Sequence, residues 1–414
     1  MQIAAKAREA SRKTAAMTTE LKNRALWQIA DELERNKPLI FEANQRDLTA
    51  AKSLLETGDI TKSVFNRLKL DENKMRNMIC GVRDVAGLAD PVGKILLKRE
   101  LDNGLLLQKV SCPIGVIGII FEARPDVIVQ ISSLAIKSGN AVILKGGKEA
   151  VHTNKKLLSV INSALQKIDG FPVAAIQQVF TRDDVNAMLK CDRHIDLIIP
   201  RGGNRLVQFI KENTKIPVLG HAAGVCHIFI DESADEDMAA KIVIDAKTQY
   251  PSACNSVETL LIHKHFKENE KLLSTLRAAG IKLLDSPDDW SFEYDDPTLA
   301  YKTVDDIDRA IEHINCYGSG HTDAIVTENA ANAAKFMNEV DSAGVYHNVS
   351  TRFADGFRYG FGAEVGISTN KTHARGPVGL EGLTIYKYKL IGNGHIVAEY
   401  MDGSKTFHHR DLTI

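Results

Sequence analysis

The residue of this chain best suited to covalent chemistry is Cys254. It lies in the stretch Lys247-Thr-Gln-Tyr-Pro-Ser-Ala-Cys-Asn-Ser-Val-Glu258, between an apolar helix-like run (238–246) and an apolar strand-like run (257–263). Pro251 ends the preceding helix, and the residues around the thiol are small or polar. A thiol on a polar loop between two apolar elements is typical of a nucleophile. The alternative stays open at this point, because free cysteines often pack as small hydrophobic residues.

The composition is that of an ordinary globular protein. At 414 residues, the chain is long enough for two or three domains. The net charge of −1 gives no electrostatic reason to expect a nucleic-acid or membrane partner. Six scattered cysteines without a C-x-x-C pair argue against a disulfide framework and against a zinc or other metal site. No signal-peptide pattern opens the chain, so a cytoplasmic location is expected.

The pattern of apolar runs predicts the α/β fold class. Residues 2–86 are predicted to be helical, and residues 114–231 alternate between continuous apolar strands and amphipathic helices. Such strands form a parallel sheet covered on both faces, and ligands bind at the carboxyl ends of its strands. The expected strands are 116–120, 141–144, 176–180 and 197–199, and the expected helices are 125–138, 149–165, 182–189 and 204–211.

Two glycine loops fall at the carboxyl ends of these strands, Lys145-Gly-Gly-Lys148 and Pro200-Arg-Gly-Gly-Asn204. Each precedes a helix, so backbone N–H groups at the helix N-terminus and nearby basic residues suit an anion. Neither loop is a G-x-G-x-x-G fingerprint, and plain glycine turns are the alternative. Two basic loops on one sheet favour a phosphate-bearing ligand.

Two β-hairpins are expected outside this sheet. Asp102-Asn-Gly separates the extended runs 95–98 and 105–110, and Gly392-Asn-Gly394 is predicted to turn a second hairpin within 383–399. Their exposed edges suggest sheet extension between subunits of a homo-oligomer, with surface flaps as the alternative. A second α/β unit begins near Ser233, with a strand over 260–263, a helix over 304–315, a strand over 322–327, a helix over 330–340 and a strand over 344–347.

Five stretches carry more specific combinations of residues: Cys112-Pro-Ile-Gly-Val-Ile-Gly with Glu122-Ala-Arg-Pro125, Ile198-Ile-Pro-Arg-Gly-Gly203, Tyr250-Pro-Ser-Ala-Cys254-Asn, His313-Ile-Asn-Cys-Tyr-Gly318-Ser-Gly-His321-Thr-Asp323, and Phe361-Gly-Ala-Glu-Val-Gly-Ile-Ser368 followed by His373-Ala-Arg-Gly-Pro-Val378. In this order, they resemble the γ-glutamyl phosphate reductase family of the aldehyde dehydrogenase superfamily. The resemblance implies a Rossmann-type NADP-binding domain (1–95, 114–231 and about 356–382), a catalytic domain (232–355) and β-hairpin oligomerisation elements (96–113 and 383–414).

The resemblance also implies the reaction. Members of the family reduce L-glutamyl 5-phosphate to L-glutamate 5-semialdehyde with NADPH and release phosphate, the second step of proline biosynthesis. Cys254 would form the thioester, aided by backbone N–H groups around Cys254 and Asn255, which is the second catalytic candidate, and by Lys247. Glutamate 5-kinase, which makes the labile acyl phosphate, is the expected partner. Ordinary aldehyde dehydrogenases carry a water-activating Glu where this chain has Val218-Leu-Gly-His-Ala-Ala-Gly224, and the missing base argues against thioester hydrolysis.

The same resemblance assigns the remaining site residues. Cofactor binding is expected from Lys145, Gly146, Gly147 and Lys148 near the adenosine ribose and its 2′-phosphate, and from Arg201, Gly202, Gly203 and Asn204 near the pyrophosphate. Substrate binding is expected from Arg352, supported by Asn348 and Ser350, because a free α-carboxylate suits a bidentate arginine, with a surface or interface arginine as the alternative. Arg124 is expected to bind phosphate or the carboxylate, with an ion pair to Glu122 or Asp126 as its alternative. An ordinary aldehyde dehydrogenase and an inactive binding protein are the competing functions.

Overall fold

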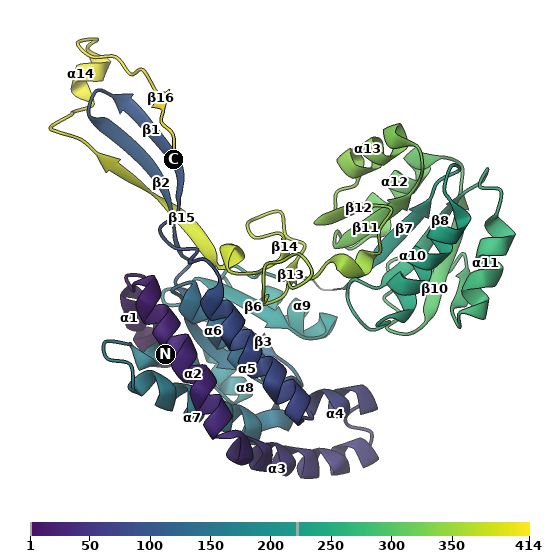
Figure 1. Cartoon of the computed structure of the whole chain (residues 1–414), viewed down its shortest axis with the longest axis horizontal. Helices are drawn as coiled ribbons and strands as arrows, with labels where there is room; N and C mark the ends of the chain where they lie inside the picture. The colour runs from purple at the N-terminus through teal and green to yellow at the C-terminus, as the bar shows by residue number, and fades with distance from the viewer. Residues whose placement is uncertain (1, 221–222) are drawn as a thin grey trace. The chain divides into compact units, whose positions relative to one another are not determined.

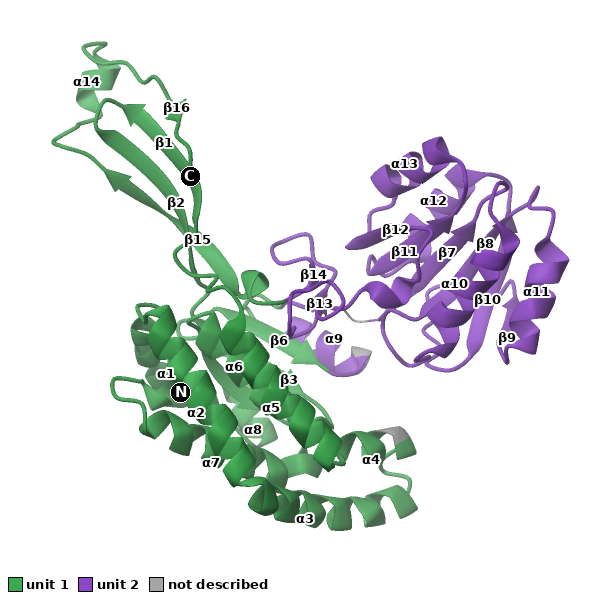
Figure 2. Ribbon diagram, in the orientation of Figure 1, with its two compact units in different colours: residues 1–201, 213–218, 379–414 green, residues 202–212, 219–378 purple. Residues whose placement is uncertain are grey.

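The chain folds into two compact units (Figure 2). The structure is a computed structural model that describes residues 2–220 and 223–414, apart from the side chains of Ser63 and Asn204. Unit 1 comprises Met1–Arg201, Asn213–Val218 and Gly379–Ile414, and unit 2 comprises Gly202–Glu212 and Leu219–Val378. In the described part of the chain, no helix is both long and apolar enough to cross a membrane.

Unit 1 begins with the predicted helices, which Figure 1 shows at the start of the chain. The Thr18 side chain accepts a hydrogen bond from the Leu21 N–H at 3.3 Å and caps α2. Leu26, Ile29 and Leu33 of this helix are buried. The five helices are α1 (Gln2–Thr14), α2 (Thr19–Arg35), α3 (Lys37–Glu56), α4 (Lys62–Leu68) and α5 (Glu72–Gly87).

A parallel sheet of order β5-β4-β3-β6 follows and confirms the predicted alternation. All six residues of β3 are buried, so both faces of the sheet are covered. The order places β4 and β6 on the two sides of β3. The loops at the carboxyl ends of β4 and β6 are therefore both neighbours of the loop that follows β3. The elements are β3 (Val116–Phe121), α6 (Asp126–Lys137), β4 (Ala141–Lys145), α7 (Val151–Gln166), β5 (Ile176–Gln178), α8 (Arg182–Leu189) and β6 (Leu197–Arg201).

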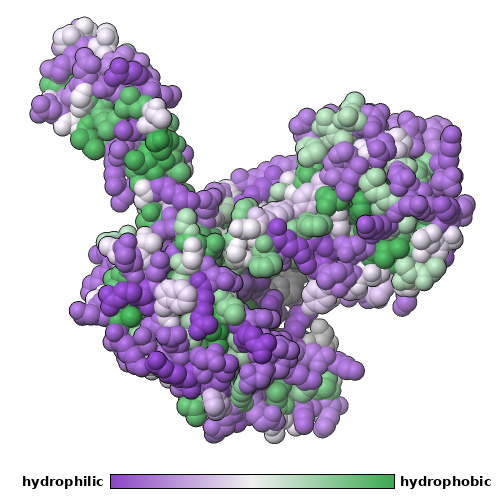
Figure 3. All heavy atoms as spheres, in the orientation of Figure 1, coloured by the Kyte–Doolittle hydropathy of each residue, from purple (hydrophilic) through white to green (hydrophobic). Residues whose placement is uncertain are grey.

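A separate antiparallel sheet of order β15-β2-β1-β16 forms an arm of unit 1 (Figure 1). The first hairpin is confirmed by β1 (Ile95–Asp102) and β2 (Leu105–Pro113). The second hairpin is wrong, because β15 (Thr384–Ile391) pairs along its whole length with β2 instead of turning back. The chain beyond forms the short helix α14 (Ala398–Met401) and reaches β1 through β16 (Arg410–Asp411). Figure 3 shows hydrophobic side chains on this arm.

Unit 2 is built on a six-stranded parallel sheet of order β12-β11-β7-β8-β10-β9. The expected domain boundary at 231 is not where the structure divides, because β7 pairs with β8 and β11 in the centre of this sheet. Residues 356–378 also fall in unit 2 rather than with the cofactor-binding sheet. The strands are β7 (Cys226–Ile230), β8 (Val257–His263), β9 (Lys282–Asp285), β10 (Thr298–Val304), β11 (Thr322–Val326), β12 (Gly344–His347), β13 (Ile367–Ser368) and β14 (Gly376–Pro377).

The helices of unit 2 differ from expectation at one start. The helix expected over 304–315 begins later, because Val304 ends β10 and the Asp306 side chain caps α12 by accepting from the Arg309 N–H at 2.9 Å. The helices are α9 (Asn204–Asn213), α10 (Glu236–Thr248), α11 (Asn269–Ala278), α12 (Ile307–Tyr317) and α13 (Ala330–Glu339).

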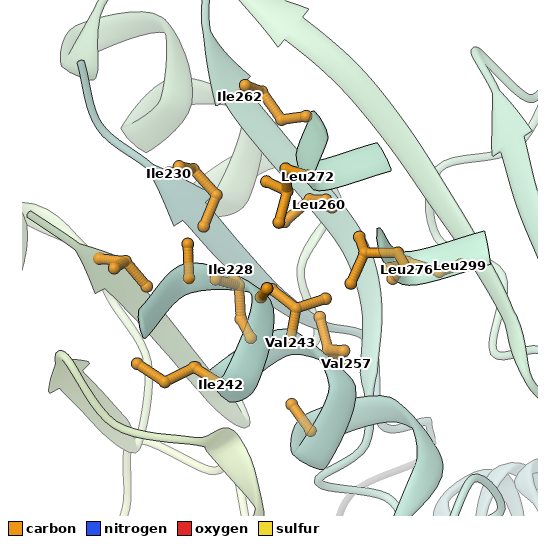
Figure 4. Close-up of a cluster of buried hydrophobic side chains, with 14 of the residues drawn as sticks. Ile228, Ile230, Ile242, Val243, Val257, Leu260, Ile262, Leu272, Leu276 and Leu299 are labelled. Carbon is orange, nitrogen blue, oxygen red and sulfur yellow. The ribbon is translucent and has the colours of Figure 1, made fainter. Parts of the chain in front are cut away.

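A buried apolar cluster holds α10 and α11 against this sheet (Figure 4). Val243 of α10 and Leu276 of α11 pack against Leu260 of β8 and its neighbours, and all three are fully buried. Burying each such side chain stabilises the fold by about 1.5–3 kcal/mol. The cluster therefore anchors both the helix before Cys254 and the strand after it.

Candidate active site

The cysteine loop, residues 249–256, connects the end of α10 to the start of β8. Cys254 is half-buried in it, and two backbone bonds shape the turn: Ala253 N–H to Tyr250 O at 3.1 Å and Ser256 N–H to Ala253 O at 2.8 Å. The Ser256 hydroxyl also donates to Ala246 O at 3.2 Å. Because the loop is short, is bonded internally and is bonded to α10, it holds the Cys254 thiol in one place.

A buried ion pair joins the two ends of this loop. Lys247 Nζ donates to Glu258 Oε2 at 2.7 Å, and both side chains are fully buried. Burial raises the pKa of Glu258 to about 8, against the opposing attraction of Lys247. Because the ammonium group of Lys247 is bound to Glu258, the pair serves to close the base of the loop, and the suggested role of Lys247 in activating the thiol finds no support in this contact.

Gly224 packs directly against the backbone of Cys254. A Cβ at this position would lie 2.5 Å from Cys254 Cα and would overlap Cys254 O. Only glycine therefore fits beside the cysteine. The neighbouring thiol of Cys226 donates to Cys254 O at 3.4 Å, and burial raises its pKa well above the ordinary value. His221 and Ala222, which belong to the stretch compared with the water-activating motif, lie outside the described residues.

The 3₁₀ turn Thr351–Phe353 is bonded to the cysteine loop from the other side. The Thr351 hydroxyl donates to Asn255 O at 2.7 Å, and Asn255 Nδ2 donates to Ala354 O at 2.8 Å. The carboxamide of Asn255 thus positions the loop. The group of this residue that stays available for the predicted catalytic role is its backbone N–H.

Arg352 brings a buried positive charge to this turn. Its side chain is buried, with the residue 8% exposed, and Nε donates to Gln249 Oε1 of the cysteine loop at 2.9 Å. Burial lowers the pKa of Arg352, with the charge of Arg358 acting in the same direction and Cys254 opposing them. Among the described residues, no carboxylate lies within 4.0 Å of this guanidinium. A buried cation without a carboxylate partner is suited to an anionic ligand.

Asn348 and Ser350 are used by the fold itself. Asn348 has φ +55°, a conformation that asparagine tolerates, and both ends of its carboxamide bond the Thr327 backbone at 2.9 and 3.0 Å. The Ser350 hydroxyl accepts from the Arg352 N–H at 3.3 Å. Both positions follow from local turn chemistry, so their predicted support of substrate binding is not reflected in these contacts.

The predicted cofactor residues of unit 1 gather at one edge of its sheet. Lys145 ends β4, Gly146 and Gly147 are buried behind it, and Lys148 is exposed. The neighbouring β3 loop is bonded to β6, since the Glu122 N–H donates to Arg201 O at 3.2 Å.

The N-terminus of α7 is not the anion site that the sequence suggested. The buried carboxylate of Asp47, from α3, accepts from the N–H groups of His152 and Thr153 at 3.0 and 2.7 Å and from the Thr153 hydroxyl at 2.6 Å. These groups would otherwise attract a phosphate. The first glycine loop can therefore offer a cofactor its lysines and loop backbone, but not this helix end.

The second glycine loop divides between the units. Arg201 ends β6 in unit 1, whereas Gly202 and Gly203 are exposed residues of unit 2 that precede α9. Asn204 is the first residue of α9, and its side chain lies outside the described part of the structure. Gly203 O accepts from the Leu206 N–H at 2.9 Å, which starts the helix directly after the glycines.

Arg124 lies in the loop that follows the carboxyl end of β3. Its guanidinium lies 3.2 Å from Asp126 Oδ2, and about half of the arginine side chain is exposed. This is the ion pair named as its alternative role. An exposed pair of this kind is weak, about 0–1 kcal/mol, so the guanidinium can still exchange partners with an incoming anion.

Comparison with known proteins decides the family. The model of the aldehyde dehydrogenase family matches residues 1–291. This chain belongs to the aldehyde dehydrogenase family. A γ-glutamyl phosphate reductase of Brachyspira hyodysenteriae is 56% identical over 98% of this chain and 98% of its own length. One from Trichodesmium erythraeum is 51% identical over 100% of this chain and 98% of its own. The crystal structure of γ-glutamyl phosphate reductase from Thermotoga maritima matches with a TM-score of 0.91 at 40% identity, covering 95% of this chain and 99% of that one. These matches confirm the resemblance and the aldehyde-dehydrogenase-like fold.

The two histidines of the motif, His313 and His321, are packed inside unit 2. His313 packs edge-on against Trp290, with ring centroids 4.8 Å apart, and lies 4.7 Å from Tyr317. His321 is buried, and its Nδ1 lies 2.9 Å from the Thr322 hydroxyl. Burial lowers the pKa of His313 to about 3, helped by His227 and Lys302.

This lowered pKa predicts an acid-sensitive fold. His313 binds a proton in the unfolded chain below its ordinary pKa of 6.5 but resists one in the folded state, so the stabilisation is present above pH 6.5 and is lost as the pH falls toward 3. Between pH 7 and pH 5, wild type should lose about 2 kcal/mol more unfolding free energy than His313→Phe, which keeps the aromatic packing. Urea unfolding at both pH values measures this, and parallel losses in the two proteins would contradict it.

Sequence reasoning missed several residues that organise the site. In the sequence, Gly224 is only part of the stretch compared with the water-activating motif, and its packing on Cys254 appears only when distant segments meet. Glu149, whose carboxylate accepts from the Ala123 N–H at 2.7 Å, carries no motif that marks it. Asp47 lies in α3, more than 100 residues before the helix that it caps. A lone Asp in a helix gives no sequence signal for that function.

Proposed function

We propose that this chain is an NADPH-dependent γ-glutamyl phosphate reductase, which converts L-glutamyl 5-phosphate to L-glutamate 5-semialdehyde in proline biosynthesis. The observation that carries this is 56% identity to such a reductase over 98% of both chains. It is an oxidoreductase, and the half-buried Cys254 on its internally bonded loop is the group suited to the chemistry.

The chain supplies the nucleophile and its surroundings. The Cys254 thiolate attacks the acyl carbonyl, forming a carbon–sulfur bond and breaking the bond to the phosphate oxygen, so phosphate leaves and a thioester remains. NADPH, when bound, supplies the hydride that reduces this thioester. Cys254 then departs as thiolate while the substrate oxygen becomes the aldehyde carbonyl. Backbone N–H groups of the cysteine loop are proposed to stabilise the negative oxygen of the intermediates.

The residues at the edge of the β4 loop fit an NADP-type cofactor. Lys148 is exposed, and the next residue, Glu149, has its carboxylate bonded to the Ala123 N–H at 2.7 Å. An exposed cation attracts the 2′-phosphate, whereas an acidic side chain would repel it. Lys145, Gly146 and Gly147 complete this proposed subsite, with Arg201, Gly202, Gly203 and Asn204 at the pyrophosphate.

Lys148→Glu should raise the KM for NADPH by about 10- to 100-fold, the cost of one charge-assisted contact, and leave NADH use nearly unchanged. Steady-state rates with both cofactors measure it. Lys190→Glu makes the same charge change at the C-terminal end of α8, away from the carboxyl ends of the strands, and should have no effect. Equal losses for NADPH and NADH would refute the role of Lys148.

For the substrate, we propose that Arg352 binds the α-carboxylate. Its guanidinium is buried, belongs to the same unit as Cys254, and lacks a carboxylate partner among the described residues. Arg124 is the proposed second anion contact, for the phosphate. Asn348 bonds the Thr327 backbone and the Ser350 hydroxyl accepts from the Arg352 N–H, and their support of substrate binding stays a prediction.

We also propose that the arm joins subunits of a homo-oligomer. In the described part of the chain, β15 is the edge strand of its sheet, and Tyr388, Leu390 and Ile391 are each more than half exposed on it. Apolar edge strands of this kind pair with other chains. Sedimentation velocity should give a multiple of 45.5 kDa. A single monomer peak would contradict it.

The forward reaction tests the function. L-Glutamyl 5-phosphate is made in place by glutamate 5-kinase from glutamate and ATP, and NADPH oxidation is followed by the loss of NADPH absorbance. Oxidation that requires kinase, ATP and glutamate together supports the proposal, and none under these conditions contradicts it. Direct hand-over from the kinase and a cytoplasmic location stay predictions.

A further inference from the structure

We propose that Glu149 is a positioning residue that fixes the β3 loop, residues 122–125, against the cofactor loop, residues 145–148. This inference rests on the proposed function, because it assigns the second loop to NADPH. The carboxylate of Glu149 joins two loops that the sheet order makes neighbours.

The first contact is to a strained residue. Glu149 Oε1 accepts the Ala123 N–H at 2.7 Å, and Ala123 has φ +45°, in the left-handed region that alanine rarely adopts. A charged acceptor makes a stronger bond than a neutral one and offsets the conformational cost. Glu149 therefore holds Ala123, and with it the backbone direction of Arg124.

The second contact explains Gly147. This residue has φ −60° and ψ 151°, which any amino acid adopts, so its backbone does not require glycine. A Cβ there would overlap Glu149 Oε1 and lie 2.6 Å from Oε2. The space beside Gly147 is filled by the Glu149 carboxylate, so a side chain at position 147 would displace that carboxylate.

The charge of Glu149 makes this placement necessary. A carboxylate adjacent to Lys148 and turned to solvent would weaken the attraction of that lysine for a phosphate. Bonded to Ala123, it leaves Lys148 as the exposed charge. On its other side, the β3 loop is bonded through Glu122 N–H to Arg201 O at 3.2 Å. Glu149 thus completes a hydrogen-bonded row across the β4, β3 and β6 ends.

The test compares Glu149→Ala, Glu149→Gln and Gly147→Ala. Loss of a charge-assisted bond predicts that Glu149→Ala lowers kcat/KM for NADPH by about 10- to 100-fold. Glu149→Gln keeps an acceptor oxygen and should recover most of this loss. Gly147→Ala should match Glu149→Ala, because its methyl group displaces the carboxylate. In the double variant the methyl group meets no carboxylate, so Gly147→Ala should add little to Glu149→Ala.

A second measurement does not depend on activity. Hydrogen exchange at the amides of residues 122–124 should accelerate in Glu149→Ala and Gly147→Ala but not in Glu149→Gln. Unchanged exchange, or additive losses in the double variant, overturns the proposal. If Glu149→Ala does not fold, Gly147→Ala and Glu149→Gln decide alone. Accelerated exchange in a chain that fails the forward assay would uphold the contact while refuting the proposed function.

Discussion

Cys254→Ala should lower turnover by at least about 10⁴-fold while NADPH still binds, because the variant has no atom that can carry the acyl group. The loop around it is held by its own backbone bonds and by the buried Lys247–Glu258 pair, so the fold should persist. NADPH oxidation in the forward assay measures the loss, and fluorescence titration measures cofactor binding.

Cys316→Ala is the matched control, since it removes an exposed thiol from α12 of the same unit and should keep wild-type turnover. Residual activity of Cys254→Ala within about tenfold of wild type would exclude a covalent role on the scale expected for a lost nucleophile.

Gly224→Ala should lower kcat by about 100-fold or more. Its new Cβ would lie 2.5 Å from Cys254 Cα, so the backbone of the nucleophile must move, and a shift near 1 Å costs about this much in rate. Crowding should also reduce the free energy of unfolding by about 1–3 kcal/mol. Forward rates and urea unfolding measure the two effects separately.

Gly87→Ala provides the comparison, because a Cβ at this glycine meets no atom within 4 Å. It should leave rate and stability close to wild type. If Gly224→Ala unfolds no more easily and turns over as fast as Gly87→Ala, the packing of Gly224 on Cys254 does not position the nucleophile.

The parts of the fold that sequence predicted are those set by local pattern. Continuous apolar runs at 116–120 and 141–144 predicted buried parallel strands, and β3 and β4 lie there. The same pattern located Lys145 and Arg201 at strand ends. Cys254 could be placed on a loop because proline and small residues interrupt two apolar elements.

The contacts that sequence did not predict join residues far apart in the chain. Asp47 caps α7 and Asn255 bonds Ala354, pairs separated by about 100 residues. Residue type alone allowed Asn255 and Asn348 to be site residues, yet both carboxamides bond the backbone. Strand β15 likewise pairs with β2 instead of forming a local hairpin, because a long partner strand satisfies more of its backbone hydrogen-bonding groups.

The boundary of the catalytic unit shows the same limit. Residues 226–230 read as one more apolar strand after the cofactor sheet, and nothing in their composition tells which sheet they join. In the structure β7 lies between β11 and β8, beside the strand that follows Cys254. This pairing brings Gly224 and Cys226 to Cys254.

The most direct test of the account is NADP⁺ reduction by L-glutamate 5-semialdehyde, measured with and without inorganic phosphate. If Cys254 carries a thioester that phosphate resolves, NADPH formation depends strictly on phosphate and is absent in Cys254→Ala. NADPH formation without phosphate would mean that water resolves the thioester, and would contradict the assignment as an acyl phosphate reductase.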